Sequence, residues 1–330
     1  MKVLVRSIEI AFYLSVIICL LVILAGCKPS SGEKKIGIIV PIEHKAMNEI
    51  VAGFTETLRA STSVPFRIKV ANAQGDINLE RAIIQQMKNE NYDIIVPIGT
   101  DATQMSATMI PSQPIVSLAA SITQQERVQR KHCNIAVVHD EISADQLIQF
   151  IHLVNPQLKR IALIHSASDK VFPEVTAAVA AGKRYGIELK PMMVPTLNEL
   201  YSTANNIPAD MQGILVLKDS LIVSGISTLE ITAEKRHIPL ITSDQGSVQD
   251  GAAFALGVHE RQIGTEGAAL AADVLNGKPV CSLPMVDMTK LTIFVNKSSL
   301  DKEQQSLTAI QTAASKLNYK LEMVDKKSGS

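Results

Sequence analysis

Residues 35–60 read KIGIIVPIEHKAMNEIVAGFTETLRA, and this stretch decides the fold. Its first seven residues, KIGIIVP, are a short apolar run typical of a buried strand. The apolar residues that follow recur at helical spacing, and they are Met47, Ile50, Val51, Phe54 and Leu58. A buried strand followed directly by an amphipathic helix is the unit from which helix-covered parallel sheets are built.

The same unit repeats along the chain. In the first half, further strands are predicted over 66–72, 92–99 and 114–120, and helices over 78–89 and 101–109. After a helix over 141–154, the second half predicts strands over 160–166, 187–194, 213–218 and 239–244, and helices over 173–185, 197–206 and 220–236. The end of the chain adds strands over 252–258, 286–288 and 291–296 and a helix over 260–275. Two successive halves of roughly 100 residues each predict an α/β protein with two lobes and a parallel sheet in each.

The first 26 residues predict an export signal. Lys2 and Arg6 precede an uncharged run over 10–25, and LAGC at 24–27 resembles a lipobox, where bacterial lipoproteins are lipidated on Cys and cleaved before it. An uncleaved membrane anchor is the alternative, but the run is shorter than the roughly 20 residues that span a bilayer. We therefore expect a signal peptide over 1–26, lipidation of Cys27, and a flexible tether over 27–34.

Two cysteines, Cys133 and Cys281, lie in the body of the chain. An oxidising compartment would permit a disulfide between them, and two separate buried thiols are the alternative. The Cys and His spacings do not resemble a zinc site, so we expect neither a metal nor a cofactor.

Polar residues follow the predicted strands at their carboxyl ends, where ligands bind in parallel α/β sheets. Two such sheets facing each other across a cleft could clamp one polar ligand. Helix N-capping is the alternative role for a Ser, Thr, Asp or Asn in these loops. The candidate ligand-binding residues are Glu43, His44, Gln74, Thr100, Asp101, Ser121, Ser166, Ser168, Asp219, Ser220 and Asp244.

Six segments carry a family resemblance. They are KKIGIIVPIEHKAMNEIVAGFTETL (34–58), ANAQGD (71–76), YDIIVPIGTDATQ (92–104), LKDSLIVSGI (217–226), IPLITSDQGSVQDGAAFALGV (238–258) and LAADVLNGKP (270–279). These segments resemble the ABC-transporter substrate-binding proteins of the tryptophan/tyrosine-type family, over nearly all of residues 34–300. The resemblance implies a type I periplasmic-binding-protein fold, in which two Rossmann-like lobes are joined by three hinge crossovers and close on a ligand.

The resemblance also implies where the lobes begin and end. The expected first lobe takes residues 35–142 and about 260–288. The expected second lobe takes 143–259 and about 289–320, and a tail follows over 321–330.

Some positions match the family's ligand region. Glu43 stands at the acidic position of the family's Glu-His pair, and Thr100 matches the Thr after the third strand. Asp219 and Asp244 match two further acidic positions. An acidic side chain in the cleft suits a ligand ammonium group, and helix-start N–H groups suit a carboxylate, a combination that would fit an amino acid.

Other positions depart from the family. Ser121 to Thr123 replaces a Thr-Asp-Pro, NIAV at 134–137 replaces Asn-Val-Thr-Gly, and SASDKV at 166–171 replaces a Glu-x-Asn-Ser loop. Ser220 stands where the family has Asn, and His259-Glu260 stands at a Tyr-rich spot. The chain has no Trp, and Phe172 is the only obvious aromatic residue near a cleft loop. The identity of the ligand therefore stays open.

Three other classes of protein fit the sequence less well. The 32 basic and 32 acidic residues balance, whereas a nucleic-acid binder needs a basic excess. The enzyme motif G-x-S-x-G and a glycine-rich phosphate loop are missing from the sequence. A transcription regulator of the same fold is disfavoured by the export signal and by the lack of a basic helix-turn-helix before the first lobe.

The sequence as a whole predicts an extracytoplasmic solute-binding lipoprotein. We expect it to capture a small polar ligand, with an amino acid as one candidate, and to deliver it to the permease of an ABC importer. It should be a monomer that is lipid-anchored to a membrane, faces the periplasm or the extracellular side, and does not bind nucleic acid. A ligand-sensing lipoprotein that signals to a membrane partner is the alternative.

Overall fold

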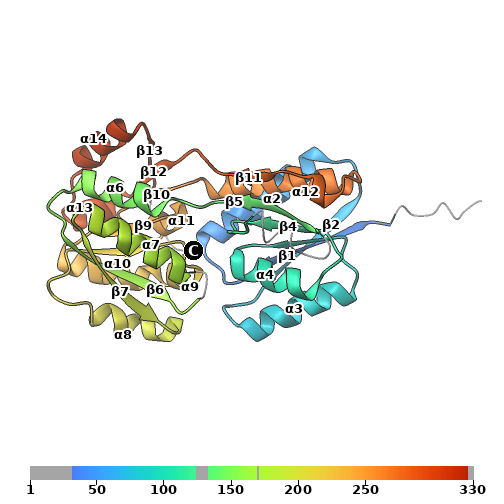
Figure 1. The fold of residues 1–330 in the computed structure, drawn as a ribbon, viewed down its shortest axis with the longest axis horizontal. Coiled ribbons are helices and arrows are strands. Elements are labelled where there is room, and N and C mark those ends of the chain that lie inside the picture. The colour runs from blue at the N-terminus through green and yellow to red at the C-terminus, as the bar shows by residue number, and fades with distance from the viewer. Residues whose placement is uncertain (1–31, 124–132, 169–170, 326–330) are drawn as a thin grey trace, which may run out of the picture.

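The computed structural model describes residues 32–123, 133–168 and 171–325. These residues form two β-sheets that lie side by side along the long axis of the molecule, with helices on both faces of each (Figure 1). The α/β class predicted from the sequence is confirmed. The predicted signal peptide and the lipidation site Cys27 lie outside the described residues.

The first sheet is entirely parallel and has the order β11-β5-β4-β3-β1-β2. Its strands are β1 (Lys34–Val40), β2 (Phe66–Asn72), β3 (Ile94–Pro97), β4 (Ile115–Leu118), β5 (Ile135–His139) and β11 (Met285–Asp287). Along β1, Ile36 and Ile38 point into one apolar core and Ile39 into another, as expected for a strand covered on both faces.

The second sheet has the order β13-β12-β10-β9-β8-β6-β7. Its strands are β6 (Arg160–Ser166), β7 (Glu188–Val194), β8 (Gly213–Val216), β9 (Leu240–Thr242), β10 (Phe254–Gly257), β12 (Thr292–Val295) and β13 (Lys320–Met323). Strand β12 runs antiparallel to β10 and parallel to β13, and the other neighbours are parallel.

Helices cover the faces of both sheets. Around the first sheet they are α2 (Lys45–Ser61), α3 (Ile77–Asn89), α4 (Thr100–Met109) and α12 (Glu260–Leu275). Around the second they are α6 (Ala144–Val154), α7 (Val171–Arg184), α8 (Leu200–Asn205), α9 (Ser220–Ser224), α10 (Ile226–Arg236), α11 (Gln245–Gln249), α13 (Lys297–Lys302) and α14 (Leu307–Leu317). Two short 3-10 helices are η1 (Leu197–Glu199) and η2 (Val280–Ser282).

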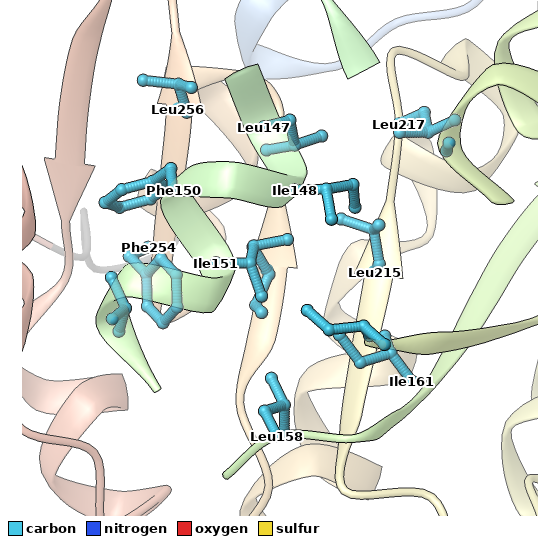
Figure 2. Packing of buried hydrophobic residues seen from close by; sticks show 14 of the residues in the cluster. Leu147, Ile148, Phe150, Ile151, Leu158, Ile161, Leu215, Leu217, Phe254 and Leu256 are labelled. Carbon is cyan, nitrogen blue, oxygen red and sulfur yellow. The ribbon is translucent and has the colours of Figure 1, made fainter. Parts of the chain in front are cut away.

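The core of the second sheet is built around α6. Phe150 of this helix packs edge-on against Phe254 of β10, with ring centroids 5.8 Å apart. Figure 2 shows Ile151 and Leu147 of the same helix near them, with Leu215 of β8 and Ile161 of β6 further to the right. Helix α6 follows a strand of the first sheet, so this packing fixes the point at which the chain changes lobe.

The chain passes between the sheets three times. It does so from β5 to α6, from β10 to α12, and from β11 to β12. These are the three crossovers that the family resemblance implies, and they place the carboxyl ends of the first parallel sheet opposite those of the second.

The structure departs from the predicted elements in several places. Strand β5 was not predicted, because its apolar run of four residues is too short to distinguish from a buried loop. The helix predicted over 220–236 is interrupted at Gly225, which separates α9 from α10. The segment after residue 296, for which no elements were predicted, contains α13, α14 and β13. Strand β13 continues to Met323, into the segment expected to be a tail.

The two cysteines of the body form a disulfide. Cys133 and Cys281 have Cα atoms 5.4 Å apart, and the bond joins the start of β5 to η2. The sequence left this pairing open, and the alternative of two separate thiols is wrong.

Helices α2 and α12 approach each other closely because glycine stands at their contact. A Cβ added at Gly264 would overlap the backbone carbonyl oxygen of Ile50, and one at Gly53 would overlap the carbonyl oxygen of Arg261. Both helices begin at the edge of the first sheet that faces the second, so this contact positions their first residues, Lys45 and Glu260.

We predict that Gly264→Ala separates these helices and lowers stability. Overpacking of this kind costs about 1–3 kcal/mol, which corresponds to a fall of about 5 °C in the midpoint of thermal unfolding. Ala269→Ser, at an exposed position of the same helix, is the control and should change the midpoint by less than about 2 °C. Equal midpoints for the two variants would show that the close contact is not required.

Candidate ligand-binding site

Three adjoining cavities lie between the carboxyl ends of the two sheets. Their volumes are about 540, 210 and 50 Å³, and residues from both lobes line each of them. Lys218, which follows β8, lines all three. Thr100, at the start of α4, lines the two larger cavities. The strand ends that the sequence predicted as a binding region therefore enclose three cavities that share lining residues.

A buried ion pair crosses this region. The Nζ atom of Lys218 lies 2.5 Å from Oδ2 of Asp140, which follows β5 in the first sheet, and the two side chains are only 15% and 8% exposed. Burial by itself would lower the pKa of Lys218, but the charge and hydrogen bond of Asp140 and the neighbouring carboxylates more than offset this and raise it. The lysine is therefore held as a cation and links the two sheets.

Glu260 and His44 face the smallest cavity and have unused hydrogen-bonding capacity. Glu260 begins α12, and its Oε1 accepts a hydrogen bond from the backbone N–H of Gln245 at 2.9 Å. Its Oε2 is buried without a hydrogen-bond partner among the described residues, as are both ring nitrogens of His44. Burial, together with the charge of Asp244, raises the pKa of Glu260 to about 8. Burial lowers the pKa of His44, although Asp244 and Asp250 oppose this.

Two predicted site residues, Asp219 and Asp244, are helix N-caps. Asp219 accepts hydrogen bonds from the backbone N–H of Ser166 at 2.5 Å and of Ile222 at 3.4 Å. Asp244 accepts from the backbone N–H and the hydroxyl of Ser247, at 2.7 and 2.5 Å. The capping role that the sequence left open thus applies to both, and it fixes their carboxylates at the cavity walls.

The two lobes also touch each other around the cavities. The hydroxyl of Ser168 donates to Oδ2 of Asp101 at 2.8 Å, and Lys45 pairs with Asp250 at 2.5 Å. Gly246, in α11, lies so close to the backbone of Ala46 that a Cβ would not fit. These contacts join residues of the first lobe to residues of the second. The two lobes are therefore in direct contact around the cavities.

Most of the predicted ligand-binding residues line the cavities. His44, Thr100, Asp101, Ser121, Ser166, Ser168, Asp219, Ser220 and Asp244 do so. Glu43 and Gln74 line none of the three. The Glu43 carboxylate is exposed and accepts from Asn72 at 3.4 Å, whereas the exposed Gln74 occupies a tight turn with φ +55°.

Sequence reasoning did not propose several acidic residues of the walls. The carboxyl side chains that line the three cavities are Glu80, Asp101, Asp140, Glu141, Glu174, Asp219, Asp244 and Glu260. Asp140 was missed because β5, the strand before it, was missed. Glu260 could have been proposed from the sequence, because it stands where the resembled family has a Tyr-rich spot.

The described walls contain no aromatic ring other than the imidazole of His44. Phe172 precedes Pro173, which lines the largest cavity. The side chain of Phe172, however, is exposed and packs on His165. The described residues also contain no group of three or more His, Cys, Asp or Glu placed to hold a metal ion. Within the same residues, none of the helices has the length and apolar character needed to span a membrane.

Comparisons with known proteins agree with this architecture. The sequence model of a family described as ABC transporter substrate binding protein matches residues 35–316. An uncharacterized protein of Rickettsia prowazekii is 38% identical over 284 residues, which cover 86% of this chain and 90% of that protein. A tyrosine-binding protein of Clostridioides difficile is 24% identical over 291 residues, which cover 85% of this chain and 84% of that protein.

A solved structure shows the same fold. It is an ABC domain from Streptococcus pneumoniae in complex with L-Trp, which is 20% identical and superposes with a TM-score of 0.79. The match covers 88% of this chain and all of that chain.

We predict that Lys218→Met destabilises the protein by about 3 kcal/mol, because it leaves a buried carboxylate without its ion pair. Urea unfolding would measure the change. Lys297→Met is the control, because Lys297 pairs with Asp301 at an exposed site, where an ion pair contributes about 1 kcal/mol or less. Adding Asp140→Asn to Lys218→Met should recover part of the loss. Similar losses in the two lysine variants would mean that the buried pair has no special role.

Proposed function

The chain belongs to the ABC transporter substrate-binding protein family, and from this premise we propose that it captures a small polar ligand between its two lobes and delivers it to an ABC importer. The observation that carries the proposal is the set of adjoining cavities at the facing carboxyl ends of the sheets. The largest, at about 540 Å³, is of the size that small-molecule sites have in proteins.

The chemistry of the walls suits a ligand with both donors and acceptors. Hydroxyl groups of Thr100, Ser121 and Ser243 line the main cavity beside the Lys218–Asp140 pair. The unused oxygen of Glu260 and the ring nitrogens of His44 would gain partners if a polar group of the ligand reached the smallest cavity. An amino acid meets these requirements, and the Clostridioides difficile relative is named as a tyrosine-binding protein.

The three crossovers would act as hinges in this function. A ligand held by residues of both lobes favours the closed arrangement, because only in that arrangement does it touch both. We propose that the first lobe comprises residues 35–142 and about 260–288, the second 143–259 and about 289–320, and that the closed monomer is the form that the permease recognises.

The proposed function predicts that small polar ligands stabilise the protein against heat. The full chain, purified in a non-ionic detergent, would be screened with L-amino acids, diamines, sugars and nucleosides while thermal unfolding is recorded. A ligand at a hundredfold excess over its Kd adds about 2.7 kcal/mol, enough to raise the midpoint by several degrees.

The variant Gly246→Ala is a test of closure within the same screen. Its added Cβ would collide with Ala46 and hold the lobes apart, so the midpoint shift should shrink while the ligand-free protein stays folded. Failure of every compound to raise the wild-type midpoint would count against the receptor function.

We also propose that Cys27 carries the lipid that holds the protein at the membrane surface. The predicted lipobox at 24–27 and the polar segment after it support this. Cys27→Ala is expected to abolish labelling of the expressed protein by a radioactive fatty acid. Cys133→Ala is the control and should stay labelled. Undiminished labelling of Cys27→Ala would exclude lipidation at Cys27.

A further inference from the structure

The walls of the interlobe cavities are acidic, although the chain as a whole is neutral. The eight carboxyl side chains named above line them, whereas Lys218 is the one lysine or arginine among the described lining residues. The full sequence has 32 basic and 32 acidic residues. Carboxyl groups are thus concentrated in the described walls of the cleft, and those that are ionised attract a ligand of positive charge.

Glu80 stands apart from the other wall carboxylates. It lies in the first turn of α3, is only 7% exposed, and lines the cavity of about 210 Å³. Its Oε1 atom is buried and has no hydrogen-bond partner among the described residues. A buried carboxylate oxygen without a partner is costly, so a ligand that supplies one gains affinity there.

Asp101 lies on the wall of the same cavity and acts on Glu80 electrostatically. Burial, followed by the charge of Asp101, raises the pKa of Glu80 to about 7. Asp101 already joins the two lobes, because its carboxylate accepts a hydrogen bond from the hydroxyl of Ser168 in the second lobe. A cation placed between Glu80 and Asp101 would relieve their repulsion and would strengthen the closed arrangement at the same time.

The remaining walls of this cavity fit an ammonium group better than a metal ion. Ser166, Ser168 and Ser220 add hydroxyl oxygens that can accept hydrogen bonds, and Ile42, Ile77 and Met105 add apolar surface for an alkyl chain. The absence of a metal-holding group among the described residues agrees with this. This cavity adjoins the main cavity, because Thr100 and Lys218 line both.

We propose that the cavity bounded by Glu80 and Asp101 is a subsite for an alkylammonium group, and that the ligand of the cleft is therefore a net cation such as a basic amino acid or an aliphatic diamine. This inference rests on the proposed function, since it names the class of compound that the receptor takes.

Two matched pairs of probes test the subsite by calorimetry on the full chain in non-ionic detergent at pH 8. L-lysine is compared with L-norleucine, and 1,5-diaminopentane with 1-aminopentane. Each pair differs in one terminal ammonium group, and the two pairs distinguish an amino acid ligand from a diamine. At least one of the probes with the additional ammonium group, L-lysine or 1,5-diaminopentane, should bind about tenfold or more tightly than its partner.

Two variants then locate the effect. Glu80→Gln and Asp101→Asn should each reduce that preference severalfold. Glu90→Gln, at an exposed residue that caps the other end of α3, should leave it unchanged. Because Glu80→Gln removes a buried carboxylate, its unfolding midpoint without probe should equal or exceed that of the wild type, which shows that any loss of binding is not a loss of fold.

Several results would overturn the subsite. Equal affinity within both probe pairs would do so, as would an undiminished preference in both Glu80→Gln and Asp101→Asn. Failure of all four probes to bind would also do so. The receptor function is judged separately, because neutral compounds in the thermal screen would still raise the midpoint if only the cationic subsite were wrong.

Discussion

The Lys218–Asp140 ion pair is the interaction on which the interlobe region depends. A lysine ammonium group buried to this extent stays charged only if carboxylates surround it, and Asp140 supplies the closest one, at 2.5 Å. The lysine follows β8 of the second sheet and the aspartate follows β5 of the first. Because the buried ammonium group of Lys218 needs a carboxylate partner, the ion pair holds the carboxyl ends of the two sheets together at this point. The cavities lie around this pair.

The rest of the cleft follows from this arrangement. Glycine at the contact of α2 and α12 lets α12, which enters from the second sheet, pack on the first, and so sets Glu260 opposite Gln245. Helix caps fix Asp219 and Asp244 at the walls. Among the described residues, His44, Glu80 and Glu260 line the cavities with buried polar atoms that have no hydrogen-bond partner, and a bound ligand could supply one. Ser106, His152, Ser299 and Glu303 also have such atoms, but they line none of the three cavities.

Much of this could be predicted from local sequence. Buried strands such as β1 and amphipathic helices such as α2 have clear periodicities, and the rule that ligands bind at strand carboxyl ends led to Thr100, Asp219 and Asp244. The missing parts depend on tertiary structure. Strand β5 is too short to have a period, so Asp140 had no strand end to mark it. Glu80 looks like an ordinary acidic residue in the first turn of a helix, where the helix dipole favours one. Only its tertiary surroundings, in which Asp101 lies close enough to act on it electrostatically, make Glu80 a buried group. The disulfide is similar, because spacing along the chain does not show that Cys133 and Cys281 meet.

The measurement that tests the central claim most directly is a crystal structure of the chain with the compound that stabilises it most. If the lobes form a receptor, the compound will lie between the two sheets, within hydrogen-bonding distance of side chains from both lobes, beside the Lys218–Asp140 pair. A compound bound to the outer surface of a single lobe, with the interlobe cavities filled by water alone, would contradict the account.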